Sequence, residues 1–312
     1  MKKILILFFG ILVALGLSSL KGEKPEKYKV AILTPTTHPS LEQIEKGFVE
    51  KLDPQKYVCK TFNALGNKSL LRSEIEEIAH GKFDLVFTIA VGPSQMAKEV
   101  FEKKGIKTPI VFTAVPAPLK LGLVHSETSS KNQLTGVKEI THFAKQLEVL
   151  KARAKSVLLV YDPTSYSLEE DKKEVESILK AMNIQMKVVE IFKSSEILSK
   201  AAPFIDDVDA VLVIKDNTVV SGIDALVKLC NQKRKLLIAS DLDSGDKGVP
   251  LVYGVSERIY GEESAKMAMQ ILEEKKSPQE IPISAPPDRA FHFKIDPKRL
   301  QALGFPPELF HD

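Results

Sequence analysis

The sequence predicts an α/β protein of two Rossmann-like lobes, each with a doubly wound parallel sheet. The stretch VAILTPTTHPSLEQ, from Val30, is answered by VLLVYDPTSYSLEE, from Val157, at an offset of 127 residues. FDLVFTIAVGPS, from Phe83, is answered by VDAVLVIKDNTV, from Val208, at an offset of 125. In both halves, apolar runs alternate with amphipathic helical patterns, which is typical of parallel sheets covered by helices. Two similar lobes that face each other form a cleft suited to a small molecule.

The first half alternates four strand patterns with three helical ones. We expect strands at 28–33, 58–63, 83–90 and 110–114, and helices at 41–52, 69–80 and 94–103. In the first helix, Ile44, Phe48 and Leu52 recur on one face at helical spacing. The nearly continuous apolar run at 83–90 is expected of a parallel strand that is buried on both faces.

The second half repeats this order. Strands are expected at 156–161, 186–191, 208–214 and 236–240, and helices at 143–151, 167–182, 195–204 and 221–231. We expect 133–137 to cross into the second lobe, 249–255 to cross back, and 280–284 to cross a third time. A long helix at 257–274 should pack on the first lobe, and a last helix is expected at 297–303. The lobes are then 28–138 plus 253–284, and 139–252 plus 285–312, joined by hinge crossings.

The N-terminus has the pattern of a signal peptide, which we place at 1–19. Lys2 and Lys3 precede an apolar run at 4–17, which is short for a membrane span. Small residues suit cleavage after Ser18 or Ser19. The alternative is an uncleaved anchor helix, and either reading places the rest of the chain outside the cytoplasm. No cysteine follows the apolar run to carry a lipid, so we expect a periplasmic or otherwise extracytoplasmic protein.

Composition gives little support to several other functions. The net charge of +3 includes the two lysines of the signal peptide, so it does not indicate nucleic acid as a partner. Cys59 and Cys230 fall in different halves, and we favour two buried free thiols over a disulfide. Their separation does not suggest a metal site, and no cofactor is expected. The chain has no catalytic motif of the common hydrolase, protease or nucleotide-binding kinds, so we do not expect an enzyme.

Candidate ligand residues follow from the rule that open α/β sheets bind ligands beyond the carboxyl ends of their strands. Ser94, at the start of a predicted helix, would accompany free N–H groups that suit a carboxylate, and Asp216 would take an ammonium group. Together they suit a zwitterion such as an amino acid. The first lobe is expected to contribute Thr37, His38, Ser40, Ser94, Gln95 and Thr113, and the second Ser165, Tyr166, Asp216, Asn217 and Asp241.

Structural roles compete with these assignments. The serines are also ordinary helix N-caps, and Asp216 with Asn217 would equally form a simple turn. Tyr166 would stack on an apolar ligand or pack between the lobes. The acidic run Glu169, Glu170 and Asp171 is assigned to a solvated helix face.

Several segments together resemble a known family, the exported substrate-binding proteins of ABC transporters of the tryptophan/tyrosine type, or TrpX-like group. The segments are HPSLEQIEKGF (38–48), PIVFTAVPAPLKLGLV (109–124), LTGV (134–137), QLEVLK (146–151), VLLVYDP (157–163), KDNTVVSG (215–222), GEESAKMA (261–268) and ALGFPPEL (302–309). The resemblance covers nearly all of the mature chain. It implies the type I periplasmic-binding-protein fold and a ligand, often an amino acid, delivered to a membrane permease with its cytoplasmic ATPase. We expect a monomer.

The departures from this family concern the ligand. Where the family often has acidic or amide groups, this chain has Ala117, Ser165 and Ser167. Near the second crossing the family often has Asp-Tyr, and this chain has Ser256-Glu257. Asp216, Asn217, Ser94 and the loop at 38–40 match. The two halves differ where His38 aligns with Ser165 and Gly92 with Asn217. We expect these positions to determine which ligand the protein binds. The alternative function is a sensor that delivers the ligand signal to a membrane receptor.

Overall fold

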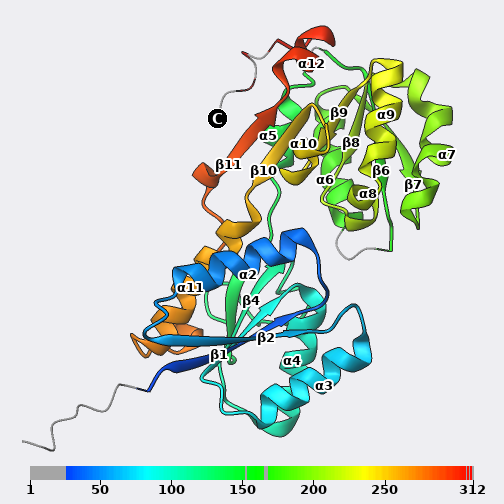
Figure 1. Ribbon diagram of the computed structural model, residues 1–312. Coiled ribbons are helices and arrows are strands. Elements are labelled where there is room, and N and C mark those ends of the chain that lie inside the picture. The colour runs from blue at the N-terminus through cyan, green and yellow to red at the C-terminus, as the bar shows by residue number, and fades with distance from the viewer. Residues whose placement is uncertain (1–25, 152, 165–167, 307, 309, 311–312) are drawn as a thin grey trace, which may run out of the picture.

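Two α/β lobes, joined by several chain segments, make up the protein. A computed structural model describes residues 26–151, 153–164, 168–306, 308 and 310, and shows the lobes one above the other (Figure 1). The predicted fold class is confirmed. The expected signal peptide at 1–19 lies outside the described residues. Within the part that is described, no helix has both the length and the apolar character needed to cross a membrane.

The first lobe is built on a five-stranded parallel sheet in the order β2-β1-β3-β4-β5. Its strands are β1 (Tyr28–Thr34), β2 (Tyr57–Asn63), β3 (Leu85–Ile89), β4 (Ile110–Val115) and β5 (Leu134–Lys138). The central strands β1 and β3 are almost wholly buried, as their apolar runs predict.

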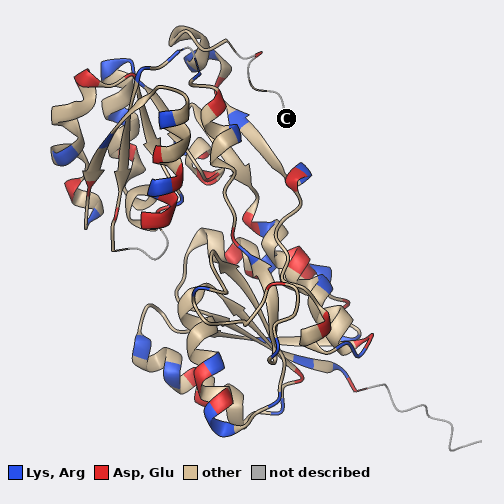
Figure 2. Ribbon diagram, turned by 180° about the vertical axis from the view of Figure 1, so that it is seen from behind, with Lys and Arg blue, Asp and Glu red and all other residues tan. Residues whose placement is uncertain are grey.

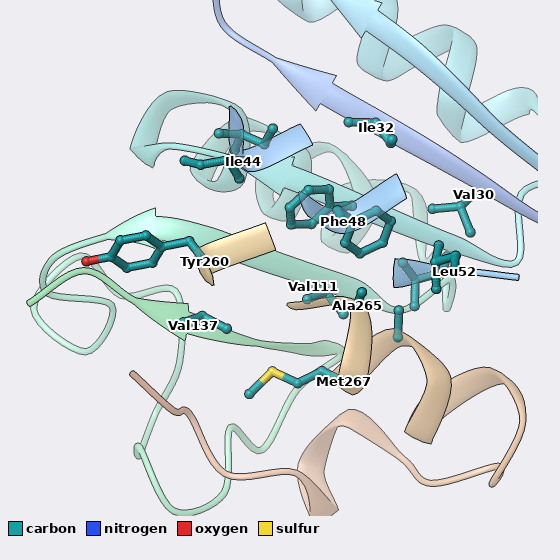
Figure 3. Packing of buried hydrophobic residues seen from close by; sticks show 14 of the residues in the cluster. Val30, Ile32, Ile44, Phe48, Leu52, Val111, Val137, Tyr260, Ala265 and Met267 are labelled. Atoms are coloured by element: carbon teal, nitrogen blue, oxygen red, sulfur yellow. The ribbon is translucent and has the colours of Figure 1, made fainter. Parts of the chain in front are cut away.

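Helices cover both faces of this sheet. One face is covered by α3 (Lys68–His80) and α4 (Val91–Lys104), and the other by α2 (Pro39–Lys51) and α11 (Glu257–Leu272). The predicted face of α2 is confirmed, because Ile44, Phe48 and Leu52 are buried against the sheet. Figure 3 shows Phe48 at the centre of this cluster, with Tyr260 at its edge and the Tyr260 hydroxyl pointing away from the other labelled residues.

Glycines let α2 and α11 approach closely. A Cβ atom at Gly261 would lie 1.9 Å from the carbonyl oxygen of Ile44, and one at Gly47 would lie 2.2 Å from the carbonyl oxygen of Arg258. A side chain at either position would force the backbones apart. This contact is long-range in sequence and attaches α11 to the first lobe (Figure 1).

The second lobe has a six-stranded sheet in the order β11-β10-β9-β8-β6-β7. Its strands are β6 (Ser156–Tyr161), β7 (Gln185–Glu190), β8 (Ala210–Val213), β9 (Leu236–Ala239), β10 (Leu251–Val255) and β11 (Phe291–Ile295). All pairs are parallel except β10 with β11. Its α-helices are α5 (Phe143–Glu148), α6 (Leu168–Ala181), α7 (Ile197–Ala201), α8 (Asn217–Ser221), α9 (Ile223–Lys233), α10 (Asp243–Asp246) and α12 (Pro297–Ala302). Short 3₁₀ helices lie at Ser194–Glu196, Ala202–Asp207, Pro278–Glu280 and Asp288–Ala290.

The predicted positions of the three crossings were wrong. Residues 133–137 belong mainly to β5, which pairs with β4, and the chain crosses only after Lys138. Residues 251–255 form β10, which pairs with β9 and β11, so this strand extends across the boundary expected at 253. Ser284 pairs with Val137 of the first sheet before the chain returns to β11. In each case a segment expected to cross forms backbone hydrogen bonds at a sheet instead, and the chain crosses only after it.

Both cysteines are free, with Cys59 half-buried in β2 and Cys230 buried in α9. Burial raises the pKa of the Cys59 thiol to about 11 and that of Cys230 to about 12. Because the thiolate is the reactive form, we expect both to react with Ellman's reagent at pH 8 at least about 10-fold more slowly than in the urea-unfolded chain. Rapid reaction of either thiol in the folded protein would contradict this burial.

Candidate functional site

A cavity of about 500 Å³ lies between the lobes, at the carboxyl ends of strands from both sheets. Its lining residues include those at the carboxyl ends of β3 and β4 in the first lobe and of β8 in the second, as expected for ligand sites in open α/β sheets. Its lining residues are Ala90, Val91, Gly92, Ala114, Pro116, Glu139, Ile140, Thr141, Phe143, Leu168, Asp171, Glu174, Lys215, Asp216 and Asn217. Such a volume accommodates a small molecule.

The N-terminus of α4 forms one wall of this cavity. Ala90 is the N-cap residue and gives no side-chain cap, so the N–H groups of Val91 and Gly92 have no capping partner in the helix. A Cβ atom at Gly92 would meet nothing within 4 Å, which leaves the helix end open toward the cleft. A 14-residue helix also presents partial positive charge at this end. This wall therefore suits an anionic group.

Two alanines beside this helix end have unusual backbone conformations. Ala90 has φ 74° and Ala114 has φ 53°, a region that residues with a Cβ atom rarely adopt. Ala114 also marks a shift of register between β4 and β5. Strain of this kind tends to collect at binding sites, where it turns the backbone toward a ligand. At both positions the small side chain leaves the backbone accessible from the cavity.

The opposite wall is acidic. Leu168, Asp171 and Glu174 lie at intervals of three residues on one face of α6, and Glu139 approaches from the first crossing. Burial, followed by the charges of Glu139, Glu174 and Glu170, raises the pKa of Asp171 to about 7. A cation placed here would relieve this repulsion. Among the described residues, no group of three or more His, Cys, Asp or Glu side chains is placed to hold a metal ion.

One lysine lies at the floor of the cavity. The Lys215 ammonium forms ion pairs with Glu139 and, at 2.7 Å, with Glu257, and it lies 5.0 Å from the centre of the Tyr260 ring. Burial alone would lower the pKa of Lys215, but the two carboxylates hold it well above its ordinary value. Figure 2 shows acidic and basic positions close together where the crossings join the lobes.

Of the residues expected to bind ligand, Asp216 and Asn217 line the cavity. Asp216 is 1% exposed, and its carboxylate accepts hydrogen bonds from the backbone N–H groups of Asp162, Thr218 and Val219. It is the N-cap of α8, which is the structural alternative raised for it from the sequence. Burial raises the pKa of Asp216, and the three N–H donors partly offset that effect. Asn217 is exposed.

The expected residues of the first loop lie away from the cavity lining. Thr37 accepts a hydrogen bond from Asn63, and the His38 ring accepts one from the backbone N–H of Ser40 as the N-cap of α2. The Ser40 hydroxyl donates across the lobes to Asp243 at 3.4 Å. This loop therefore contacts the second lobe at another point.

Three more expected residues surround α4 without lining the cavity. Ser94 lies inside the helix and is fully buried, with hydrogen bonds to Thr88 and to the carbonyl oxygen of Ala90. Gln95 is exposed and donates to the carbonyl oxygen of Leu121. Thr113 is buried, and its hydroxyl has no hydrogen-bond partner among the described residues. The helix begins at Val91, three residues before the start predicted from Ser94.

The remaining expected residues belong to the second lobe. Ser165 and Tyr166 lie outside the described residues. Asp241 accepts hydrogen bonds from the backbone N–H and the hydroxyl of Ser244, and it is absent from the cavity lining.

Four charged residues of the cavity lining, Glu139, Asp171, Glu174 and Lys215, are not among the predicted ligand residues. The sequence pattern assigns Asp171 to a solvated helix face, and it singles out neither Glu139 nor Lys215. A usable signal existed for Asp171, because the first turn of the helix after β6 faces the carboxyl end of the sheet, as α4 does in the first lobe. For Glu139 the sequence carries no comparable signal, since the crossing is expected at 133–137 and Glu139 falls after it, at the start of the second lobe.

Comparison with known proteins agrees with this architecture. A family model described as "ABC transporter substrate binding protein" matches residues 29–305. A tyrosine-binding protein of Clostridioides difficile (strain R20291) is 25% identical over 273 residues, covering 85% of this chain and 78% of that protein. An uncharacterized protein of Rickettsia prowazekii (strain Madrid E) is 28% identical over 283 residues, covering 89% and 86%.

Solved structures share the fold. An ABC domain from Streptococcus pneumonia in complex with L-Trp superposes with a TM-score of 0.76 at 22% identity, covering 90% of this chain and 97% of that one. The ligand-free, open structure of a substrate binding protein with adhesive properties from Clostridium difficile gives a TM-score of 0.73 at 22% identity, covering 89% and 95%. The match of the family model to almost the whole described chain, with the cleft between two lobes, shows that this chain belongs to the ABC transporter substrate-binding proteins.

Proposed function

We propose that this protein binds a zwitterionic amino acid in the interlobe cleft and delivers it to the permease of an ABC importer. The observation that supports this most directly is the pairing of two walls, an uncapped helix N-terminus on the first lobe and an acidic helix face on the second. We further propose that a signal peptide at 1–19 exports the chain, and that it acts as a monomer because one chain supplies both walls.

The carboxylate of the ligand is proposed to bind at α4. The N–H groups of Val91 and Gly92 would donate to it, and the helix dipole would favour its charge. The neighbouring Ala90 and Ala114 carry only methyl groups, so the ligand can approach the backbone there.

The ammonium group is proposed to bind beside Asp171, with Glu139 and Glu174 adding to the negative potential. An ammonium beside Asp171 would favour its ionised form, and closure of the lobes would bring the two ends of the ligand into contact with both walls at once. Ligand binding would then stabilise the closed arrangement.

Apolar residues between the two walls would take the side chain of the ligand. Ile140, Phe143 and Pro116 line the cavity, together with Leu168 from the α6 wall, and Phe143 and Leu168 are buried. Since one relative is a tyrosine-binding protein and one related structure holds L-Trp, aromatic amino acids are the first probes to test.

Thermal-shift and calorimetric titrations of the mature protein test this function. A probe at 100 times its dissociation constant should add about 2.7 kcal/mol of stability. L-Tyrosine, L-tryptophan and L-leucine should be compared with tyramine, which lacks the carboxylate, and 3-(4-hydroxyphenyl)propanoate, which lacks the ammonium. We expect each truncated analogue to bind about 10- to 100-fold more weakly than its parent amino acid. If no amino acid stabilises the protein, or the analogues bind equally well, the zwitterion proposal fails.

A further inference from the structure

Lys215 contacts two of the three segments that carry the chain between the lobes. It follows β8 of the second lobe, whereas Glu139 follows β5 of the first. Glu257 is the first residue of α11, just after the chain leaves β10. One ammonium group of the second lobe therefore pairs with a carboxylate at the start of the first crossing and with another at the end of the second.

The same ammonium also contacts the core of the first lobe. It lies over the ring of Tyr260, which is fully buried and belongs to the cluster formed with α2. Figure 3 shows this ring at the edge of the cluster. The Tyr260 hydroxyl lies 3.5 Å from the carbonyl oxygen of Ile140, within the first crossing. The lysine is thus connected to a rigid part of the first lobe.

Burial distinguishes this cluster from other contacts between the lobes. The side chains of Lys215, Glu139 and Glu257 are 23%, 21% and 11% exposed. In the ion pair of Lys120 with Glu170, by contrast, the side chains are 65% and 57% exposed. Exposed ion pairs contribute little to stability, whereas removal of one partner from a buried cluster leaves an uncompensated buried charge.

We propose that Lys215 is a positioning residue that joins the first and second crossings, holds the Glu139 carboxylate at the floor of the cleft and thereby limits how far the lobes open. Because the cluster lies where the crossings meet, small displacements there produce large displacements at the mouth of the cleft. Lys215 and Glu139 line the ligand cavity, but Glu257 does not. Glu257 lines a small cavity behind the ligand site with Tyr260 and Lys215. An effect of Glu257 on lobe opening would therefore act through the crossings.

The test measures lobe opening in the ligand-free protein. Lys215→Met should leave two carboxylates without their cation, Glu257→Gln should remove one of the two ion pairs, and Lys215→Arg should preserve both. We expect Lys215→Met to raise the radius of gyration measured by small-angle X-ray scattering. Amide exchange in residues 139–142 should become faster on the order of 10-fold, with a smaller change for Glu257→Gln. Lys215→Arg should restore the parent values.

Glu263→Gln is the matched control, because Glu263 pairs with Lys266 within the same helix and this ion pair includes no residue of a crossing. If Lys215→Met does not fold, Glu257→Gln still decides the question. Parent-like scattering and exchange in every variant that folds would overturn the proposal. L-Tyrosine affinity is measured separately. If the parent protein does not bind L-tyrosine, the proposed ligand is wrong, but the measurement of lobe opening still tests the role of Lys215.

Discussion

Replacing Gly261 with alanine should destabilise the first lobe by about 3 kcal/mol or more, toward the upper end of what overpacking costs. The new methyl group would lie 1.9 Å from the Ile44 carbonyl oxygen and 2.6 Å from the Phe48 backbone nitrogen. Backbone atoms cannot rotate away, so α2 and α11 must separate and loosen the packing around Phe48. Thermal unfolding should show a midpoint lower by roughly 6 °C or more.

Gly92→Ala is the matched control for this change. Gly92 is also helical, but a Cβ atom there would meet nothing within 4 Å. In a helix interior, alanine is favoured over glycine by up to about 1 kcal/mol. Because Gly92 lies in the first turn of α4, the control should be neutral or slightly stabilising. If the thermal unfolding midpoint of Gly261→Ala is no lower than that of Gly92→Ala, then α2 and α11 do not approach as closely as described.

The fold could largely be predicted because its strands and helices carry strong periodic signals. Burial alone produces the apolar run around Phe87 and the helical spacing of Ile44, Phe48 and Leu52. Both patterns can be recognised in the sequence without knowledge of the fold. The crossings could not be placed in the same way. The sequence of a segment such as β5 looks the same whether the segment crosses between the lobes or lies in a sheet. Only its pairing with β4 shows that it belongs to a sheet.

The site was harder to predict than the fold. Strand ends identify the loops that face a cleft, but the direction of each side chain depends on the helix start and on how the lobes face each other. Ser94 illustrates the first point, since α4 begins three residues earlier and turns that hydroxyl into the core. Asp171 illustrates the second, because an acidic helix face appears solvated until the other lobe covers it.

Replacing Asp171 with asparagine should weaken binding of an amino acid by about 10- to 100-fold, since hydrogen bonds to charged groups contribute about 1.5–3 kcal/mol. Asparagine keeps the shape of the side chain but removes the charge that would face the ammonium group. Isothermal titration with L-tyrosine, or with whichever amino acid the screen identifies, gives the affinity. Glu176→Gln, an exposed position on the same helix that does not line the cavity, should bind like the parent.

The pH dependence provides a second, independent measure of the same residue. In the empty cleft, the raised pKa of Asp171, about 7, means that the carboxyl is mostly protonated at pH 6 and mostly ionised at pH 8. Because an ammonium ligand favours the ionised form, binding must release a proton at low pH, and affinity should rise as pH increases through 7 and then level off. The Asp171→Asn variant has no such proton to release, so its weaker affinity should stay nearly constant over this range. An equally steep pH dependence in the variant would assign the titration to another group and remove Asp171 from the ammonium site.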